Sequence, residues 1–473
     1  MLKVDRALQI AVVGHTNTGK TSLLRTLTRD RLFGEVNDAP GTTRHVQSAS
    51  VMLDDQAALV WYDTPGLEDS VGLRDYIESL IRAGERLDNH DRIERFLADP
   101  MADVSFEQEH RVLVQAMQSD ALLYVVDARD EVLAKHRDEL FLLQACARPV
   151  LPVLNFVASP QADTKPWVQV FARQGMHVYV GFDSISPPIN GQQMMYDTLG
   201  QVLAEHRPLL NALSVSAAQQ RRDRVIAAID LLAALCVTVA GLNRMVKDDV
   251  AAIEQAIKKQ QDEVREHEQL FVEHILELYE FSTEDYLPTT EGWSDGQWQA
   301  DVFSEETLAK LGIKLGKGAA VGAAAGAVVD ILSAGLSLGT GTLIGAAAGS
   351  AWQSVDRFGK DIAAKWRGQR SLMVSDAVVL ALATRNIRLI AALEQRGHAS
   401  HQPLILDKTQ EATPAFDHSA LLDAIGPARQ QTVKRQLASL VGAVPTNSAA
   451  AREVKQVLLQ ADGLRLLTVD GLH

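Results

Sequence analysis

The sequence GHTNTGKTS occupies Gly14 to Ser22 and directly follows the apolar run LQIAVV at 8–13. Its spacing, Gly14-x-x-x-x-Gly19-Lys20-Thr21, is that of a phosphate-binding loop. In such a loop the glycines let successive backbone N–H groups point at phosphate oxygens, and the following helix adds its positive dipole end. The lysine places a charge between the β- and γ-phosphates, and the threonine hydroxyl suits Mg²⁺. We therefore expect a strand, this loop and a helix that begins near Lys20.

Short apolar segments alternate with helical stretches along the first 190 residues, which predicts an α/β domain with a mostly parallel sheet. The expected strands are 8–14, 45–53, 57–63, 121–128, 150–157 and 177–184. A polar, charge-rich stretch predicts a helical insertion at about 67–118, and 190–210 predicts the closing helix. We expect residues 1–210 to form one domain and 211–473 an α-helical C-terminal domain.

The C-terminal half has long amphipathic patterns. Residues 217–280 predict one or two long helices, and further helices are expected at 357–396, 418–442 and the beginning of 449–473. Residues 316–352 are dense in Gly and Ala and predict a tight helical hairpin, interrupted at GLSLGTGT. Basic residues flank this hairpin, so two interpretations stay open: packing within a helical bundle, or conditional insertion into an anionic membrane surface.

Two further motifs follow the phosphate loop. The segment WYDTPGLED puts Asp63 at the end of an apolar strand, with Gly66 three residues later. An aspartate there can hold the Mg²⁺ shell, and the Gly66 N–H can meet a γ-phosphate. The segment DAPGTTRHV lies between the phosphate loop and WYDTPGLED, and its paired threonines can cap Mg²⁺ and the γ-phosphate. Three elements in this order favour a GTPase-like switch over other phosphate-loop proteins.

GHTNTGKTS, PGTTRHV and DTPG resemble the G1, G2 and G3 motifs of the Era/TrmE (MnmE) group of GTPases, over roughly residues 7–185. The whole chain resembles bacterial Era-like GTPases with a C-terminal domain of unknown function. The resemblance implies GTP or GDP with Mg²⁺ as ligands. It implies catalytic roles for Lys20, Thr43 and Gly66, with Thr42 as the next choice after Thr43, and Mg²⁺ contacts from Thr21, Thr43 and Asp63. The nucleotide would be bound by Gly14, Asn17, Thr18, Gly19, Lys20, Thr21, Ser22 and Asn155.

The residue after the D-x-x-G motif is Leu67, where Ras-like enzymes use a glutamine that orients the attacking water. An aliphatic side chain cannot bind water, so we expect slow turnover without an activator. Several members of the resembled group use a bound K⁺, held by an asparagine that matches Asn17. A monovalent cation there would offset γ-phosphate charge. The alternative is that Asn17 is simply a good loop residue.

The guanine-recognising N-K-x-D motif is incomplete in this chain. Asn155 is present, but Phe156 replaces the lysine and Ala158 the aspartate. Asp163 and Asp183 are the candidates to replace the lost carboxylate. Loss of one charged bidentate contact costs on the order of 1.5–3 kcal/mol. Guanine is the expected base, because switch motifs of this type belong to GTPases.

Composition limits the partners. The net charge of −14 makes a polyanion partner unfavourable, so nucleic acid is not expected. The two cysteines, Cys146 and Cys236, lie in apolar stretches and predict core packing in a reducing compartment. The N-terminus lacks a signal-peptide pattern, which predicts a cytoplasmic protein, peripheral at the inner face of the membrane if the hairpin inserts.

Our first hypothesis is a Mg²⁺-dependent GTP-hydrolysing switch whose nucleotide state controls the helical domain and an unknown protein effector. One alternative is a membrane-remodelling or tethering GTPase. A second is a weakly hydrolysing interaction scaffold, and a third is a ribosome or RNA-related factor by analogy with Era. A nucleotide-dependent dimer is a further expectation, and completion of the catalytic site by a partner or by self-association stays open.

Overall fold

We describe a computed structural model of the chain. It describes residues 6–34, 46–82, 85–247, 249–287, 302–303, 308, 311, 313, 336–339, 369–400, 402–405, 416–438 and 449–461. The chain divides into two compact units. Unit 1 comprises Met1–Arg221 together with Gln395–His401, and unit 2 comprises Arg222–Glu394 and Gln402–His473.

Unit 1 is built on a six-stranded sheet in the order β2-β3-β1-β4-β5-β6. Only the β2–β3 pair is antiparallel, so the sheet is mostly parallel, as predicted. The strands are β1 (Leu8–Val13), β2 (Gln47–Leu53), β3 (Gln56–Asp63), β4 (Ala121–Asp127), β5 (Val150–Asn155) and β6 (Val180–Gly181). All six expected strands are confirmed, the last being the shortest.

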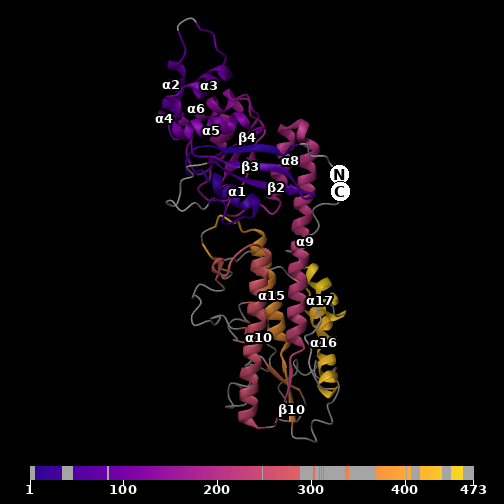
Figure 1. Cartoon of the computed structure of the whole chain (residues 1–473). Helices are drawn as coiled ribbons and strands as arrows, with labels where there is room; N and C mark the ends of the chain where they lie inside the picture. The colour runs from indigo at the N-terminus through magenta and orange to yellow at the C-terminus, as the bar shows by residue number, and fades with distance from the viewer. Residues whose placement is uncertain are drawn as a thin grey trace. The chain divides into compact units, whose positions relative to one another are not determined.

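Helices cover both faces of this sheet. They are α1 (Lys20–Thr28), α2 (Ser70–Ser79), α3 (Asn89–Ala98), α4 (Ala102–Ser105), α5 (Glu107–Gln118), α6 (Ala134–Ala145), α7 (Lys165–Arg173), α8 (Gly191–Val202), the 3₁₀ turn Ala204–His206 and the first half of α9 (Arg207–Ala240). Figure 1 shows α1 on one side of the strands and α5 and α6 on the other.

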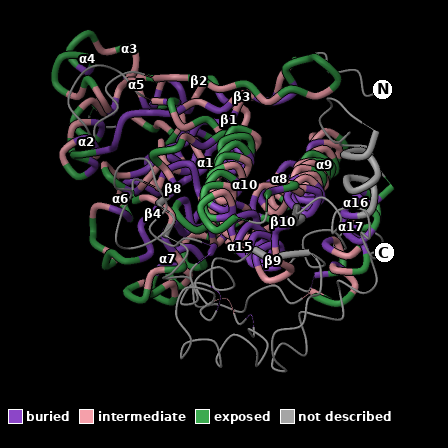
Figure 2. The backbone as a smooth tube through the Cα atoms, turned by 90° about the horizontal axis from the view of Figure 1, so that it is seen from below, coloured by how far each residue is buried: buried purple, intermediate pink, exposed green. Residues whose placement is uncertain are grey.

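Alternate strand residues supply two apolar cores, because successive side chains point to opposite faces. Ile10 and Val12 pack with α1, α8 and the start of α9, whereas Ala11 and Val13 pack with α2, α3, α5, α6 and α7. β4 is buried along its whole length, while the edge strand β2 alternates between intermediate and exposed residues. Figure 2 accordingly shows β1 and β4 mostly in purple. The sheet therefore holds the carboxyl ends of its central strands rigidly.

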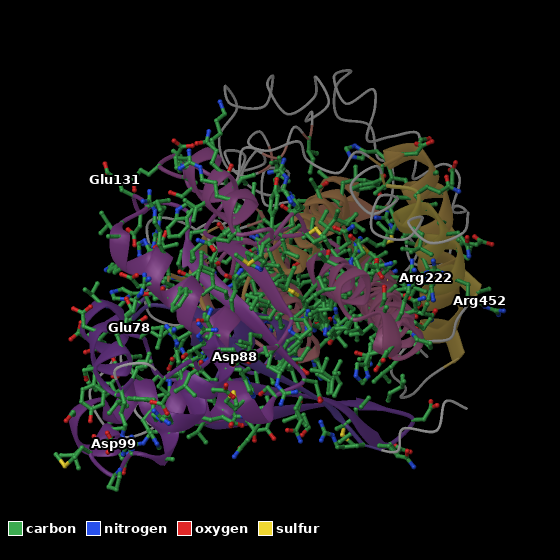
Figure 3. All side chains as sticks on the ribbon, turned by 90° about the horizontal axis from the view of Figure 1, so that it is seen from above. Glu78, Asp88, Asp99, Glu131, Arg222 and Arg452 are labelled. Carbon is green, nitrogen blue, oxygen red and sulfur yellow. The ribbon has the colours of Figure 1, made fainter. Side chains whose placement is uncertain are left out.

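The predicted helical insertion consists of α2 to α5. Asp69 caps α2 by accepting from the Gly72 N–H, and Asp88 and Asp91 form a capping box at the start of α3. Figure 3 labels Glu78, Asp88 and Asp99 on this part of the chain. Glu78 forms an ion pair with Arg92 at 3.0 Å. These charges thus lie on a solvated face, where such pairs contribute little to stability.

Unit 2 combines long helices with a small antiparallel sheet in the order β7-β10-β9. Its elements are the remainder of α9, β7 (Asn243–Lys247), α10 (Val250–Leu278), the 3₁₀ turn Thr283–Asp285, β8 (Tyr286–Leu287), β9 (Leu336–Gly339), β10 (Gln369–Val374), α15 (Asp376–Glu394), β11 (Leu404–Ile405), α16 (His418–Ala438) and α17 (Ala449–Leu459). The long helices are confirmed.

The expectation of helix alone across 217–280 and 357–396 is wrong at two places. β7 interrupts the first stretch, and β10 lies within the second, directly before α15. The two strands pair with each other, Gln369 opposite Lys247 and Met373 opposite Asn243. Each strand therefore depends on a partner more than a hundred residues away, which a local periodicity does not reveal.

The Gly/Ala-rich hairpin predicted at 316–352 lies outside the described residues, except for β9. That strand falls on the interruption expected at GLSLGTGT and pairs with β10, Ser371 opposite Gly339. Among the helices of the described residues, none combines the length and the apolar character that crossing a membrane requires.

Candidate functional site

The loop Gly14–Thr21 connects β1 to α1, at the carboxyl edge of the sheet. Two of its positions require glycine. Gly14 has φ 146°, and a Cβ there would lie 2.3 Å from the Val125 carbonyl oxygen. Gly19 has φ 83°, and a Cβ there would lie 2.4 Å from Asn155 Nδ2. Both Gly14 and Gly19 therefore let the loop pass close to β4 and β5 in a backbone conformation that L-residues rarely adopt.

Lys20 is the first residue of α1, and its side chain is turned back under the loop. Its Nζ donates to the carbonyl oxygens of His15 at 2.7 Å and Gly14 at 3.1 Å, and the residue is 7% exposed. Burial lowers the pKa of Lys20 to about 8, against the opposing effect of the carboxylates of Asp63, Glu139 and Glu68. An ammonium in this setting is poorly solvated, so an anion beside it would be bound strongly.

Thr21 and Asp63 meet beside Lys20. The Thr21 hydroxyl donates to Asp63 Oδ2 at 2.6 Å, and Asp63 ends β3 with no exposed surface. A hydroxyl and a carboxylate at this separation are hard oxygen donors of the kind that Mg²⁺ takes through one or two protein ligands. The donor set therefore fits the predicted Mg²⁺ site.

The segment after Asp63 packs against the phosphate loop. A Cβ on Gly66 would lie 2.1 Å from Thr16 Oγ1 and 2.7 Å from Thr16 N, so only glycine fits there. The next residue, Leu67, is fully buried in the core, and its N–H donates to the Gly14 carbonyl at 3.1 Å. The Leu67 side chain therefore points away from the loop.

Glu109 of α5 holds the next turn of this segment. Its Oε1 accepts from the N–H groups of Glu68 and Asp69, both at 3.0 Å, and Glu109 is 6% exposed. The Thr16 hydroxyl also donates to Glu68 Oε1 at 3.2 Å. The inserted helices thus fix the segment that carries Gly66.

A partly buried polar network starts at His15 of the phosphate loop. Lys135 donates to His15 Nε2 at 2.7 Å, so Nδ1 carries the proton and faces the Leu67 carbonyl at 2.5 Å and Glu139 Oε1 at 3.0 Å. Glu139 Oε2 accepts from the Tyr124 hydroxyl at 2.7 Å. Burial, with Glu139 nearby, raises the pKa of Tyr124 well above its usual value, so Tyr124 stays a donor. The network ties the phosphate loop to the segment of Gly66 and to α6.

Asn155, at the end of β5, connects the phosphate loop to the loop after β6. Its Nδ2 donates to the Thr18 carbonyl at 3.1 Å. Its Oδ1 accepts from the N–H groups of Phe156 at 2.9 Å and Ser184 at 3.1 Å. Asn155 therefore organises the site through backbone contacts.

The carboxylates considered as replacements for the missing aspartate have other partners. Asp183 is 4% exposed and accepts from three N–H groups, those of Ile185 and Ser186 at Oδ1 and that of Ala158 at Oδ2. Asp163 accepts from the Lys165 N–H at the start of α7. In this structure both carboxylates serve the protein's own backbone.

Phe156 lies where the motif would carry a lysine, and its ring packs on Gly19. The residue has φ 60°, and its Cζ would lie 2.8 Å from a Cβ on Gly19. Arg129, in the loop after β4, places its guanidinium carbon 4.1 Å from the centre of the Phe156 ring. Asp127 binds that guanidinium through Nε at 2.9 Å and Nη2 at 2.6 Å. Asp127 and Phe156 together hold the guanidinium in one plane.

The structure brings most of the predicted residues together. Asp63, Gly66 and Asn155 contact the phosphate loop, and Ser22 lies in the first turn of α1. The predicted residues within the loop itself are Gly14, Thr18, Gly19, Lys20 and Thr21. Thr42 and Thr43 lie outside the described residues. Asn17 is exposed with φ 66°, a backbone region that asparagine tolerates better than most residues. A K⁺ ligand at Asn17 remains a prediction.

Sequence reasoning missed His15, Lys135, Glu139 and Arg129. One signal existed in α6, where Glu139 directly precedes Leu140 on the apolar face and lies four residues after Lys135. A charge on a buried helix face suggests a polar partner. For Arg129 only the DAR sequence after β4 was available, and it does not reveal the contact with Phe156.

A segment from the C-terminal half also packs in unit 1. The Gly397 N–H donates to the Ile185 carbonyl at 2.8 Å. A Cβ on Gly397 would lie 2.0 Å from the Ser184 carbonyl oxygen, so the backbones touch. His398, at 3% exposed, is buried as well. The loop that Asn155 and Asp183 organise is therefore also held by residues that follow α15.

Two family models match the chain. The first, "50S ribosome-binding GTPase", covers residues 9–156. The second, "Domain of unknown function (DUF3482)", covers residues 169–460. The second match spans well over half of the chain's 473 residues.

Curated relatives match in the N-terminal part. GTPase Der of Stenotrophomonas maltophilia is 28% identical over 167 residues, which cover 35% of this chain and 29% of Der. Translation initiation factor IF-2 of Francisella tularensis is 22% identical over 174 residues, covering 37% of this chain and 16% of IF-2. The chain thus spans less than a third of the length of either relative.

Among solved structures, Era in complex with MgGDPNP and nucleotides 1506-1542 of 16S ribosomal RNA is 15% identical, with a TM-score of 0.30. The match covers 42% of this chain and 57% of Era. A bacterial selenocysteine-specific elongation factor, EF-Sec, is 14% identical, with a TM-score of 0.27 over 42% of this chain and 29% of that one. The chain belongs to the DUF3482 family, and its N-terminal part is a P-loop GTPase domain of the Era/Der/IF-2 type.

Proposed function

We propose that this protein is a Mg²⁺-dependent GTP-hydrolysing switch whose nucleotide state acts on its helical C-terminal region. The observation that carries the proposal is the poorly solvated Lys20 ammonium beside the Thr21–Asp63 pair, under a loop whose glycines cannot be replaced. A triphosphate tail would satisfy both features at once.

Each residue has a definable task in this proposal. Lys20 would leave the carbonyls of Gly14 and His15 and pair with β- and γ-phosphate oxygens. Thr21 and Asp63 would hold Mg²⁺, which would neutralise charge on the same phosphates. The Gly66 N–H would donate to the γ-phosphate, and loss of the γ-phosphate after hydrolysis would remove one contact from the segment that Glu109 also holds.

Leu67 is buried and does not position the attacking water. We expect K⁺ at Asn17 to offset the negative charge of the γ-phosphate in the transition state and to raise kcat at least ~10-fold over Na⁺. Asn17→Ala should remove the difference between the salts. Steady-state hydrolysis in matched K⁺ and Na⁺ buffers measures it, with Asn89→Ala on α3 as an exposed asparagine control. Equal rates in the two salts for the unmodified protein would contradict the K⁺ assignment.

Leu67→Gln should not create a Ras-like catalytic glutamine. Because the Leu67 side chain has no exposed surface, the new amide would enter the apolar core at a cost of ~1–3 kcal/mol. We expect a lower melting temperature and no gain in turnover. A rise of tenfold or more in kcat would show instead that this position reaches the γ-phosphate.

GTP binding should take up a proton in alkaline buffer. The lowered pKa of Lys20, about 8, means that the free protein has lost part of this charge at pH 8.5, whereas a bound triphosphate raises the pKa again. Uptake should therefore be near zero at pH 6.5 and exceed roughly half a proton at pH 8.5. Calorimetry in two buffers of different ionisation enthalpy measures it, and equal uptake at both pH values would contradict the assignment.

The contact between Gly397 and the loop at Ser184 and Ile185 supports transmission to the C-terminal region. Asn155 connects the same loop to Thr18 of the phosphate loop. A nucleotide at the phosphate loop would therefore act, through Asn155 and this loop, on the residues that directly follow α15. If the geometry of this contact differs between nucleotide states, nucleotide binding and the conformation of the C-terminal region affect each other through it.

A ribosomal partner is the second candidate function. The family model matching residues 9–156 is described as a 50S ribosome-binding GTPase, so the acidic net charge is not sufficient reason to exclude RNA. Cosedimentation with ribosomal subunits in the presence of a non-hydrolysable GTP analogue tests this candidate.

A hydrolysis assay with GTP and ATP, with and without Mg²⁺, tests the first proposal. We expect phosphate release that requires Mg²⁺ and prefers GTP. Binding without any turnover would favour the scaffold hypothesis, and absence of both would contradict the proposal.

A further inference from the structure

The base of a nucleotide held by the Gly14–Thr21 loop would lie against the loops after β4, β5 and β6. In open parallel sheets, ligands bind outside the carboxyl ends of the strands. The phosphate loop follows β1, and the neighbouring strands on one side are β4, β5 and β6 in that order. Phe156 and Asn155, which contact Gly19, mark where these loops join the phosphate loop.

Carboxylate recognition of guanine is not prepared in these loops. Asp183 is engaged with three backbone N–H groups, Asp163 with the start of α7, and Asp127 with Arg129. To accept from guanine N1–H and the 2-amino group, the buried Asp183 or Asp127 would have to abandon these partners. Asp163 is exposed and would lose its contact at the start of α7.

Arg129 offers a different recognition group in the same place. Its guanidinium lies 4.1 Å from the Phe156 ring centre, and Asp127 takes its Nε and Nη2. Within the part of the chain that the structure describes, Nη1 has no acceptor, and the side chain is 38% exposed. A fixed, charged donor edge is therefore available beside the phosphate loop.

We infer that Arg129 is the base-specificity residue of this site, where it donates to O6 and N7 of a purine. The inference rests on the proposed function and names how its substrate is selected. Guanine presents two acceptors on that edge, whereas adenine presents N7 and the N6 amino donor, so a guanidinium prefers guanine. Asp127 and Phe156 act as positioning residues. The 2-amino group of guanine is not recognised.

Nucleotide analogues separate this recognition from the carboxylate type. Competition against labelled GTP on the full chain with Mg²⁺ compares GTP, ITP, 7-deaza-GTP and ATP. ITP lacks only the 2-amino group, so it should compete within ~3-fold of GTP. The analogue 7-deaza-GTP lacks N7, and ATP lacks O6, so both should be weaker by roughly 5- to 150-fold. These comparisons need no variant and therefore do not depend on folding of a mutant.

Variants then assign the effect to Arg129. Arg129→Ala should reduce GTP affinity to the level of ATP, while ATP affinity changes by less than ~3-fold. Arg129→Lys keeps the charge but loses the planar fork, so it should lose most of the preference as well. Arg137→Ala, an exposed arginine of α6, is the matched control and should change nothing. A melting curve of each variant confirms folding.

Two results would overturn the inference. One is ITP binding tenfold or more weaker than GTP, which requires recognition of the 2-amino group. The other is an unchanged GTP-to-ATP ratio in a folded Arg129→Ala protein. If the unmodified protein binds none of the four nucleotides, the proposed function itself fails, a result distinct from both.

Discussion

Lys20→Ala is expected to abolish GTP hydrolysis, with kcat/KM reduced at least ~10³-fold, a transition-state loss of about 4 kcal/mol. The lysine is the one group in the loop that brings a full positive charge to the β- and γ-phosphates in this account. Its ammonium is buried and faces Asp63, Glu139 and Glu68, so without a lysine these three carboxylates would repel a triphosphate. Binding of Mg²⁺ and GTP should therefore weaken together with turnover.

Stability separates this effect from unfolding. Burial lowers the pKa of Lys20, which means that the folded protein holds the charge at a cost. The nucleotide-free Lys20→Ala protein should accordingly melt no lower than the unmodified protein. Lys165→Ala, an exposed lysine at the start of α7, serves as the control and should keep full turnover. Full activity in Lys20→Ala would contradict the site.

Glu268→Ala is expected to destabilise unit 2 by about 3–5 kcal/mol. Glu268 of α10 is 1% exposed and accepts from Arg385 of α15, through Nε at 2.9 Å and also through Nη2. The neighbouring Asn386 Nδ2 donates to the same carboxylate at 3.1 Å. Removing the carboxylate deprives a buried guanidinium of its counter-charge, while the cost of burying that guanidinium remains.

A paired variant tests that explanation. Glu268→Leu combined with Arg385→Met removes both charges, so we expect it to recover most of the lost stability. Urea unfolding of the full chain measures the free energy of unfolding, and Glu273→Ala, an exposed glutamate on α10, should change it by less than ~0.5 kcal/mol. A single variant within 1 kcal/mol of the unmodified protein would show that the pair is not needed.

The fold of unit 1 could be predicted because its signals are local. Each strand of the sheet is an apolar run with a turn or helix signal at its end, and the phosphate loop fixes where β1 ends and α1 begins. The strands β7 and β10 could not be predicted in this way. NRMVK and QRSLMV are short, lie beside long helices, and become strands by pairing with each other, while QRSLMV pairs with β9 as well. Such non-local pairing leaves no periodic pattern in the sequence.

The candidate site shows the same division. The roles of Lys20, Thr21, Asp63 and Gly66 follow from spacing within a motif, whereas His15 depends on Lys135 and Glu139 far along the chain. The incomplete motif predicted a replacement carboxylate from Asp163 or Asp183. The structure instead pairs Phe156 with Arg129 from the loop after β4, a contact between two loops that only the parallel sheet brings together.

Calorimetric titration of GTP into the folded full chain with Mg²⁺ measures nucleotide binding at the Gly14–Thr21 loop. We expect saturable binding of one nucleotide per chain, lost in Lys20→Ala and strongly weakened when Mg²⁺ is chelated. The absence of any heat of binding at millimolar GTP, in a protein whose melting curve shows it folded, would contradict a nucleotide site at this loop.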